Sequence, residues 1–403
     1  MKEENGKPVG ASPAESTALP EQTAGYWQRV SRQYRRAARM LTLLLILFVV
    51  VFVSLSIDAF SYNGIFYFGR DVAALTALAD DRSETVYYTY GEVESAKATY
   101  RGGVAIVFEN GVETYGADGE RLMHLDGSFS APRIAVSRDY LIAYSFGDNA
   151  FCVCNTYSEL FADTTEFPIM GAYVSDAGYF ALITGSDETL SEVLLYDGNF
   201  HLVQRFGRAS ATVSAVISDN GRYIAILGAA SDGAVLDLFM VGNAEPTLSE
   251  RFDAFPYAVS FTSFNTLAVL TDSSIHTLNI DGKSFSSVDF EGASLAAYSV
   301  GDSTVAAVLE ADRENGICRL IVTDKKGRIL LDNGTLEGRI SAISLTEQSV
   351  WILRDRTLEC LSLDGTLRGS FALENGALSM DALSETDARV FYGARAEAFS
   401  LSK

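Results

Sequence analysis

The chain has 403 residues, of which 48% are hydrophobic and 21% are charged, so it is long enough to bury a sizeable core. The first 57 residues hold seven basic and four acidic residues, which leaves 24 basic and 48 acidic residues in 58–403. We expect no nucleic-acid partner for so acidic a segment, because phosphate contacts need clustered Lys and Arg.

An apolar segment without any charge covers residues 40–57 (MLTLLLILFVVVFVSLSI). As a helix it would be about 27 Å long, close to the hydrocarbon thickness of a bilayer. Arginines crowd the side before it, and an aspartate follows it: Arg29, Arg32, Arg35, Arg36, Arg39 and then Asp58. Positive charge stays on the cytoplasmic side. The pattern predicts a single-pass transmembrane helix with its N-terminus in the cytoplasm and residues 58–403 outside.

The segments on either side of this helix are predicted to be a tail and a linker, without a folded domain. Residues 1–39 are interpreted as a cytoplasmic, largely disordered tail with a basic end. A signal peptide cleaved near Ser54 is the alternative, but the preceding region and the apolar run are both too long for that pattern. Residues 58–84 form a linker, in which 70–80 (RDVAALTALAD) is either a short amphipathic helix or irregular.

From about residue 94 the chain repeats a unit of two β-hairpins. The clearest first hairpins are AYVSDAGYFALIT at 172–184 and AVISDNGRYIAIL at 215–227, each with a Ser-Asp-x-Gly turn followed by an aromatic residue. Second hairpins turn at Asp-Gly, as at Asp197 and Asp281, which suits the positive φ angles of a two-residue turn. The first strands begin near residues 95, 132, 170, 212, 256, 294, 339 and 378.

Four strands in every ~40–45 residues are typical of a β-propeller. We therefore predict an all-β propeller over residues 85–403, with eight four-stranded blades and with seven as the alternative. The last repeat has only three strands, while an unassigned strand at 85–90 (TVYYTY) precedes the first repeat. We expect this strand to complete the last blade and close the ring, which leaves no open sheet edge.

The Ser-Asp-x-Gly-aromatic hairpins resemble those of WD-repeat, TolB-like and quinoprotein-like propellers over roughly residues 85–403. The order of basic tail, single helix, short linker and propeller is similar to that of an uncharacterised family of membrane-anchored bacterial proteins, a domain of unknown function. The resemblance implies a location at the cell surface and supplies no activity.

No group of residues in the sequence is typical of an enzyme, so we expect no enzymatic activity, no cofactor and no metal. The three histidines, His124, His201 and His276, fall on or beside repeat strands and are interpreted as structural. The aspartates of the Asp-Gly turns are isolated, whereas calcium needs several oxygens from one loop.

The four cysteines fit no redox or zinc motif. Cys152 and Cys154 would share one face of a strand, because side chains alternate along it. Cys318 and Cys360 occupy similar positions in neighbouring repeats. They are either disulfide-bonded or two buried free thiols.

Acidic loops between the second and third strands of a blade supply the candidate binding residues. These loops open on the face of a propeller that also carries the connections between blades, and the acidic ones are 185–192 (GSDETLSE), 310–316 (EADRENG) and the shorter 229–233 (AASDG). They form a possible partner-binding rim of Asp187, Glu188, Glu192, Asp232, Glu310, Asp312 and Glu314. Such a rim would meet a basic partner or a cation; acidic loops kept for solubility are the plainer interpretation.

The predicted function is therefore a binding or scaffolding module for an envelope protein or glycan, held on the outside of a bacterial cell membrane through residues 40–57. This step rests on the fold. The alternative is a hydrolase or lyase that acts on envelope polysaccharide through carboxylates, which a carboxylate cluster in the axial channel would favour. A sensor that signals to the cytoplasm is a third interpretation.

Overall fold

The computed structural model describes residues 39–47, 85–88, 94–312 and 316–401. Residues 39–47 form a helix, which belongs to a unit separate from the compact unit Tyr62–Lys403. Within the described ranges no helix combines the length and the apolar character that crossing a membrane requires. The predicted tail and linker, and most of the predicted membrane helix, lie outside the described residues, so these assignments stay predictions.

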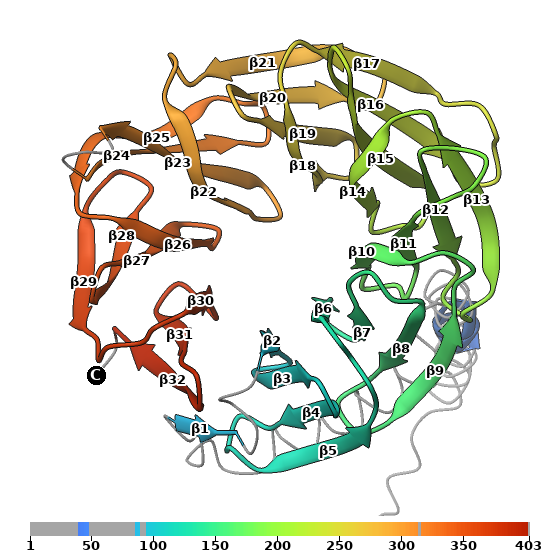
Figure 1. Cartoon of the computed structure of the whole chain (residues 1–403), viewed down its shortest axis with the longest axis horizontal. Helices are drawn as coiled ribbons and strands as arrows, with labels where there is room; N and C mark the ends of the chain where they lie inside the picture. The colour runs from blue at the N-terminus through green and yellow to red at the C-terminus, as the bar shows by residue number, and fades with distance from the viewer. Residues whose placement is uncertain (1–38, 48–84, 89–93, 313–315, 402–403) are drawn as a thin grey trace, which may run out of the picture. The chain divides into compact units, whose positions relative to one another are not determined.

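Eight antiparallel sheets of four strands each are arranged in a ring (Figure 1). We number the blades in chain order and give their strands from the axis outward. Blade 1 contains β2 (Ser95–Tyr100), β3 (Gly103–Phe108), β4 (Gly111–Tyr115) and β5 (Arg121–Asp126). Blade 2 contains β6 (Pro132–Val136), β7 (Leu141–Ser145), β8 (Ala150–Cys154) and β9 (Glu159–Thr164). Blade 3 contains β10 (Ile169–Val174), β11 (Phe180–Thr184), β12 (Ser191–Tyr196) and β13 (Leu202–Arg208).

The next three blades have the same order of strands. Blade 4 contains β14 (Ala211–Ile217), β15 (Tyr223–Ala230), β16 (Gly233–Met240) and β17 (Leu248–Phe252). Blade 5 contains β18 (Pro256–Ser263), β19 (Thr266–Thr271), β20 (Ser274–Asn279) and β21 (Ser284–Asp289). Blade 6 contains β22 (Ser294–Val300), β23 (Thr304–Asp312), β24 (Ile317–Asp324) and β25 (Ile329–Glu337).

The last two blades complete the ring. Blade 7 contains β26 (Ile340–Leu345), β27 (Ser349–Arg354), β28 (Thr357–Ser362) and β29 (Leu367–Ala372). Blade 8 contains β30 (Ser379–Ala382), β31 (Asp387–Phe391), β32 (Arg395–Ser400) and, as its outermost strand, β1 (Thr85–Tyr87). The prediction of eight blades is confirmed, and every first strand begins within one residue of the predicted position.

The ring is closed by β1, as predicted. Val86 pairs with Ala396 of β32, and the backbone N–H of Tyr88 donates to the carbonyl oxygen of Ala394 at 3.0 Å. Val86 is fully buried. The strand is shorter than the predicted 85–90: it ends at Tyr87, and residues 89 and 90 lie outside the described ones.

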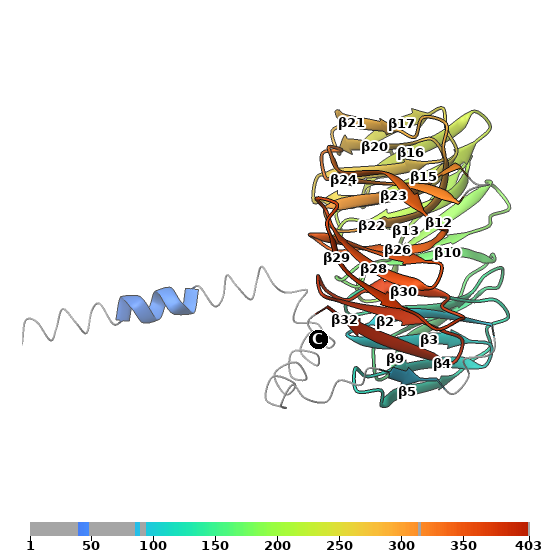
Figure 2. The ribbon, with the colours of Figure 1, turned by 90° about the vertical axis from the view of Figure 1, so that its left-hand side faces the viewer.

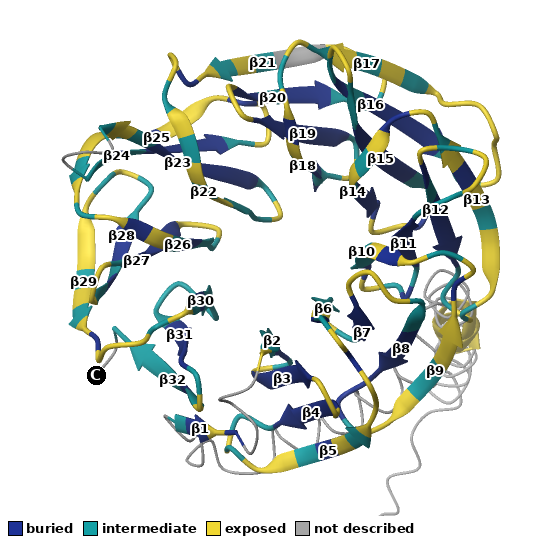
Figure 3. Ribbon diagram, in the orientation of Figure 1, coloured by how far each residue is buried: buried dark blue, intermediate teal, exposed yellow. Residues whose placement is uncertain are grey.

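The core lies between the blades. The second strands β3, β7 and β11 are buried at every position, whereas the outermost strand β17 is not buried anywhere along its length (Figure 3). Each inner strand packs on a neighbouring blade on both sides, which explains why its sequence is continuously apolar and does not alternate. Each core cluster joins residues of neighbouring blades, as where Phe151 of blade 2 contacts Phe180 of blade 3.

Side chains also tie the innermost strands of neighbouring blades together. The hydroxyl oxygen of Ser214 accepts from the backbone N–H of Val259 at 3.4 Å, and that of Ser344 accepts from Ala382 at 2.9 Å. Ser299 accepts from Leu345 at 3.2 Å in the same way. An innermost strand has an edge without a strand partner, so these serines satisfy donors that would otherwise face the axis.

The four cysteines are buried and free. The sulfur atoms of Cys152 and Cys154 lie 3.8 Å apart on β8, as expected for one face of a strand. Cys318 packs in the layer between blades 6 and 7, and Cys360 packs in the layer between blades 7 and 8. The disulfide alternative for this pair is wrong, because equivalent positions in neighbouring blades belong to different layers.

Strand ends define two faces of the ring, which Figure 2 shows from the side. We call the face with the connections between blades and the loops between second and third strands the connection face. The opposite face carries the turns between first and second strands, and we call it the turn face.

Candidate binding surface

Three of the predicted rim residues lie in loops or turns of the connection face. Asp187 and Glu188 are exposed in the loop between β11 and β12. Asp232 lies in the turn between β15 and β16, where its carboxylate pairs with Arg251 at 3.1 Å. These positions match the prediction, although Asp232 already has a cationic partner.

The predicted loops were too long. Glu192 is the second residue of β12, and it forms an ion pair with Arg205 at 3.0 Å. Glu310 and Asp312 belong to β23, where they pair in the ladder with Cys318 and Ile317 of β24. Glu314 lies outside the described residues. A strand can continue through charged residues where its side chains reach solvent, so acidity alone did not mark the loop ends.

Exposed apolar side chains on the same face were missed in the sequence. They come from blades 2 to 5, at the beginnings of first strands or in loops after second strands: Phe146, Met170, Leu190, Val213, Phe255 and Tyr257. Large apolar side chains that are this exposed and that gather on one face indicate an interaction site. Leu190, within an otherwise polar loop, was the one signal in the sequence.

Hydrogen bonds hold the backbone segments of these side chains together across blade boundaries. The N–H of Gly147 donates to Ile169 at 2.8 Å, which holds the loop of Phe146 against the strand of Met170. Ser191 and Thr212 share a hydroxyl hydrogen bond of 2.8 Å, which holds the loop of Leu190 beside the strand that contains Val213. Loop and strand therefore form a continuous surface from blade 2 to blade 4.

An aromatic cluster extends this surface onto blade 5, and from there it continues along the first strands to Tyr298, the fifth of the seven residues of β22 in blade 6. The ring centroids of Phe255 and Tyr257 lie 6.1 Å apart, and those of Tyr257 and Tyr298 lie 6.5 Å apart. Their side chains stay 55%, 39% and 42% exposed, respectively. Burial, and to a smaller extent Tyr257, raises the pKa of Tyr298, so its hydroxyl is neutral at physiological pH. These rings offer both apolar area and hydrogen-bonding groups.

The charge around the apolar residues is negative. Exposed acids on the connection face of blades 3 to 5 include Glu166, Asp187, Glu188, Asp253 and Asp272. The nearby Arg208 and Arg251 are each paired with an aspartate, Asp237 and Asp232. Their positive charge is therefore largely neutralised, and the excess charge is acidic.

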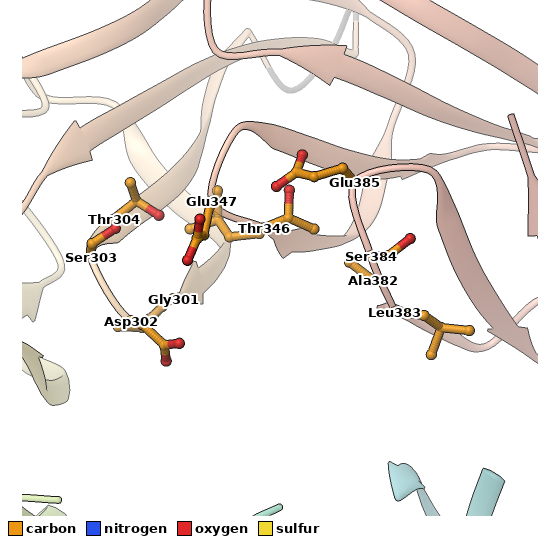
Figure 4. Close-up of a pocket in the computed structure, with 12 residues that line it drawn as sticks. Gly301, Asp302, Ser303, Thr304, Thr346, Glu347, Ala382, Leu383, Ser384 and Glu385 are labelled. Carbon is orange, nitrogen blue, oxygen red and sulfur yellow. The ribbon is translucent and has the colours of Figure 1, made fainter. Parts of the chain in front are cut away.

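The turn face contains a pocket of about 540 Å³, lined by the turns of blades 6, 7 and 8. Figure 4 shows its three carboxylates, Asp302, Glu347 and Glu385, each on a separate turn. Glu385 accepts hydrogen bonds from the N–H of Gln348 at 2.9 Å and from the hydroxyl of Ser349 at 2.8 Å. It thus ties blade 8 to blade 7.

The aspartate of the Ser-Asp-x-Gly motif has a similar role elsewhere on the turn face. Asp176 of blade 3 accepts from the N–H of Arg138 of blade 2 at 2.7 Å. Burial raises the pKa of Asp219, and the charges of Asp176 and Asp302 raise it further. Carboxylates therefore do gather at one mouth of the axis, and polysaccharide cleavage by them stays an untested prediction.

The histidines lie where the sequence indicated. His124 is on β5 and His276 on β20, while His201 directly precedes β13. His124 contacts the buried carboxylate of Glu113 at 2.9 Å; Arg121 at 2.9 Å and the Tyr115 hydroxyl at 2.6 Å satisfy the same group. This cluster is a satisfied polar core. In the part of the chain that the structure describes, no group of three or more His, Cys, Asp or Glu residues is arranged to hold a metal.

Fold and surface together define an eight-bladed β-propeller with a partly apolar, acidic connection face. Residues 82–392 match the model of a family of unknown function, DUF5711, and the chain belongs to that family. No curated protein sequence matches the chain significantly.

Solved structures support the fold. The computationally designed protein Ika8 aligns with a TM-score of 0.62 and 14% identity, over 78% of this chain and 98% of its own. Sqt1 from Saccharomyces cerevisiae aligns with a TM-score of 0.59 and 11% identity, over 78% of this chain and 98% of its own. BamB from Moraxella catarrhalis aligns with a TM-score of 0.54 and 10% identity, over 79% of this chain and 99% of its own. At such low identities the likeness concerns the fold alone.

Proposed function

We propose that this protein is a membrane-anchored binding or scaffolding module whose propeller recognises a protein partner outside the cytoplasm. The observation that carries the proposal is the gathering of exposed apolar side chains on the connection face, from Phe146 of blade 2 to Phe255 and Tyr257 of blade 5. Surfaces of this kind are typical of interaction sites.

The anchor part of the proposal rests on the sequence. Residues 40–57 carry no charge, five arginines precede them, and the propeller is acidic. The positive-inside rule then directs the propeller to the outer side. A glycan partner would also suit exposed aromatic rings, but the acidic surroundings favour a protein, which can supply complementary positive charge.

One cross-linking experiment tests both location and binding. Three variants each carry one new exposed cysteine: Leu190→Cys on the connection face, Phe264→Cys on the turn face and Leu367→Cys on an outer strand. A membrane-impermeant maleimide with a photoreactive arm is added to intact cells, which are then irradiated. The native cysteines are buried, so the wild-type chain is the control for labelling.

We expect all three variants to react in intact cells, and at least one to form a defined protein adduct that mass spectrometry identifies. Labelling only after the cells are opened would contradict the proposed location. Labelling without an adduct at any position would contradict the binding function.

A further inference from the structure

We infer that the connection face of blades 2 to 5 binds a segment of a protein partner that combines Lys or Arg with apolar side chains. The inference rests on the proposed function and adds to it the face and the chemistry of the partner. The aromatic cluster, the apolar side chains beside it and the acids around both support it.

The apolar part of the partner has a defined place. Phe255, Tyr257 and Tyr298 form a partly exposed aromatic cluster, and Met170 and Val213 continue the apolar surface on the first strands of blades 3 and 4. Aromatic side chains lose little conformational freedom when they bind, and they dominate the energetics of many interfaces.

The Lys or Arg of the partner is inferred from the negative charge of the connection face. Asp187, Glu188 and Asp253 are exposed on this face, whereas Arg208 and Arg251 are already paired with acidic side chains. A partner cation therefore gains attraction from these acids on blades 3 to 5. On blade 2 the guanidinium group of Arg133 already lies over the Phe146 ring, 5.8 Å from its centroid. A guanidinium group that reaches the exposed rings would gain a cation–π contact as well.

Peptide binding to the purified full-length chain tests the inference. Three fluorescent peptides of equal length are compared by anisotropy: one of Arg and Leu, one of Glu and Leu, and one of Arg and Ser. We expect the Arg–Leu peptide to bind most tightly, and its affinity to fall as salt is added.

Two sets of substitutions locate the site. We expect Phe255→Ser with Tyr257→Ser, and separately Asp187→Lys with Glu188→Lys, to weaken Arg–Leu binding about tenfold or more. The matched controls Phe264→Ser and Glu347→Lys change an exposed aromatic residue and an exposed acid on the turn face, and should leave binding unchanged. If the Phe255→Ser and Tyr257→Ser variant does not fold, the effect of Asp187→Lys with Glu188→Lys on Arg–Leu binding still tests the inference.

Equal binding of the three peptides, or loss of binding in the turn-face controls, would overturn the inference. Binding of an envelope oligosaccharide in place of the peptide, with the same sensitivity to the Phe255 and Tyr257 substitutions, would also overturn it. A protein adduct in cells together with failed peptide binding would leave the proposed function standing and remove only this inference.

Discussion

Glu385 illustrates why acidic residues recur in the turns of the turn face. Burial alone would raise the pKa of this carboxyl, but hydrogen bonds from Thr346, Ser349 and the N–H of Gln348 lower it below its usual value. Arg368 lies 3.6 Å away and acts in the same direction. The acid thus stabilises the contact between blades 7 and 8 while it is ionised.

Substitution Glu385→Gln should make this stabilisation visible as a pH effect. Because the pKa in the folded state is depressed, the stabilisation is fully present above the unfolded pKa of about 4.3 and is lost as the pH falls through the folded value. We expect the variant to be less stable than wild type by about 1 kcal/mol at neutral pH, from lost hydrogen bonds to a charged group. Urea unfolding at a series of pH values measures the difference.

The difference should shrink to zero in acid. Glu347→Gln is the matched control, since this exposed acid in the neighbouring turn makes none of the hydrogen bonds that hold Glu385. A stability difference that stays constant from neutral to acidic pH would show that Glu385 acts through packing and not through its charge.

At the scale of elements, β1 is the strand on which the closed ring depends. Val86 and Tyr88 are buried together with Phe108 of blade 1 and Phe391 of blade 8. The strand therefore covers the edge of β32 and also fills the layer between the last and the first blade. Without β1, the edge of β32 would be exposed and could pair with strands of other chains.

Replacing Thr85–Tyr88 by a Gly-Ser linker of equal length should lower the free energy of unfolding by about 3–5 kcal/mol, as for the loss of large core side chains. Thermal and denaturant unfolding of the full-length chain measure it. Tyr87→Ser changes an exposed residue of the same strand and should stay within about 0.5 kcal/mol of wild type. Unfolding of the linker variant at the wild-type midpoint would contradict a closing role for β1.

Elements of this fold were predictable to different degrees. The first strands and the closing strand could be found because turn motifs with fixed φ requirements recur at one spacing. The ends of β12 and β23 could not be predicted from the sequence. Glu192 and Glu310 continue these strands, because backbone pairing between strands does not require apolar side chains. The aromatic cluster was also beyond the sequence: Tyr257 and Tyr298 become neighbours only through the packing of two blades.

At the scale of the whole molecule, the two faces of the ring differ in chemistry. On the turn face, carboxylates such as Asp176 and Glu385 accept hydrogen bonds from neighbouring blades. On the connection face, Asp187 and Glu188 are exposed, and apolar side chains lie beside them. We therefore propose that the partner binds on the connection face.

Hydrogen–deuterium exchange of the full-length chain, with and without the partner recovered by cross-linking, tests this claim most directly. Binding slows the exchange of amides that it covers or rigidifies. We predict protection in residues 146–149, 185–190, 211–213 and 253–257, and no change in the turns 175–178, 218–221 and 301–304. Protection confined to those turns, or to the outermost strands, would contradict it.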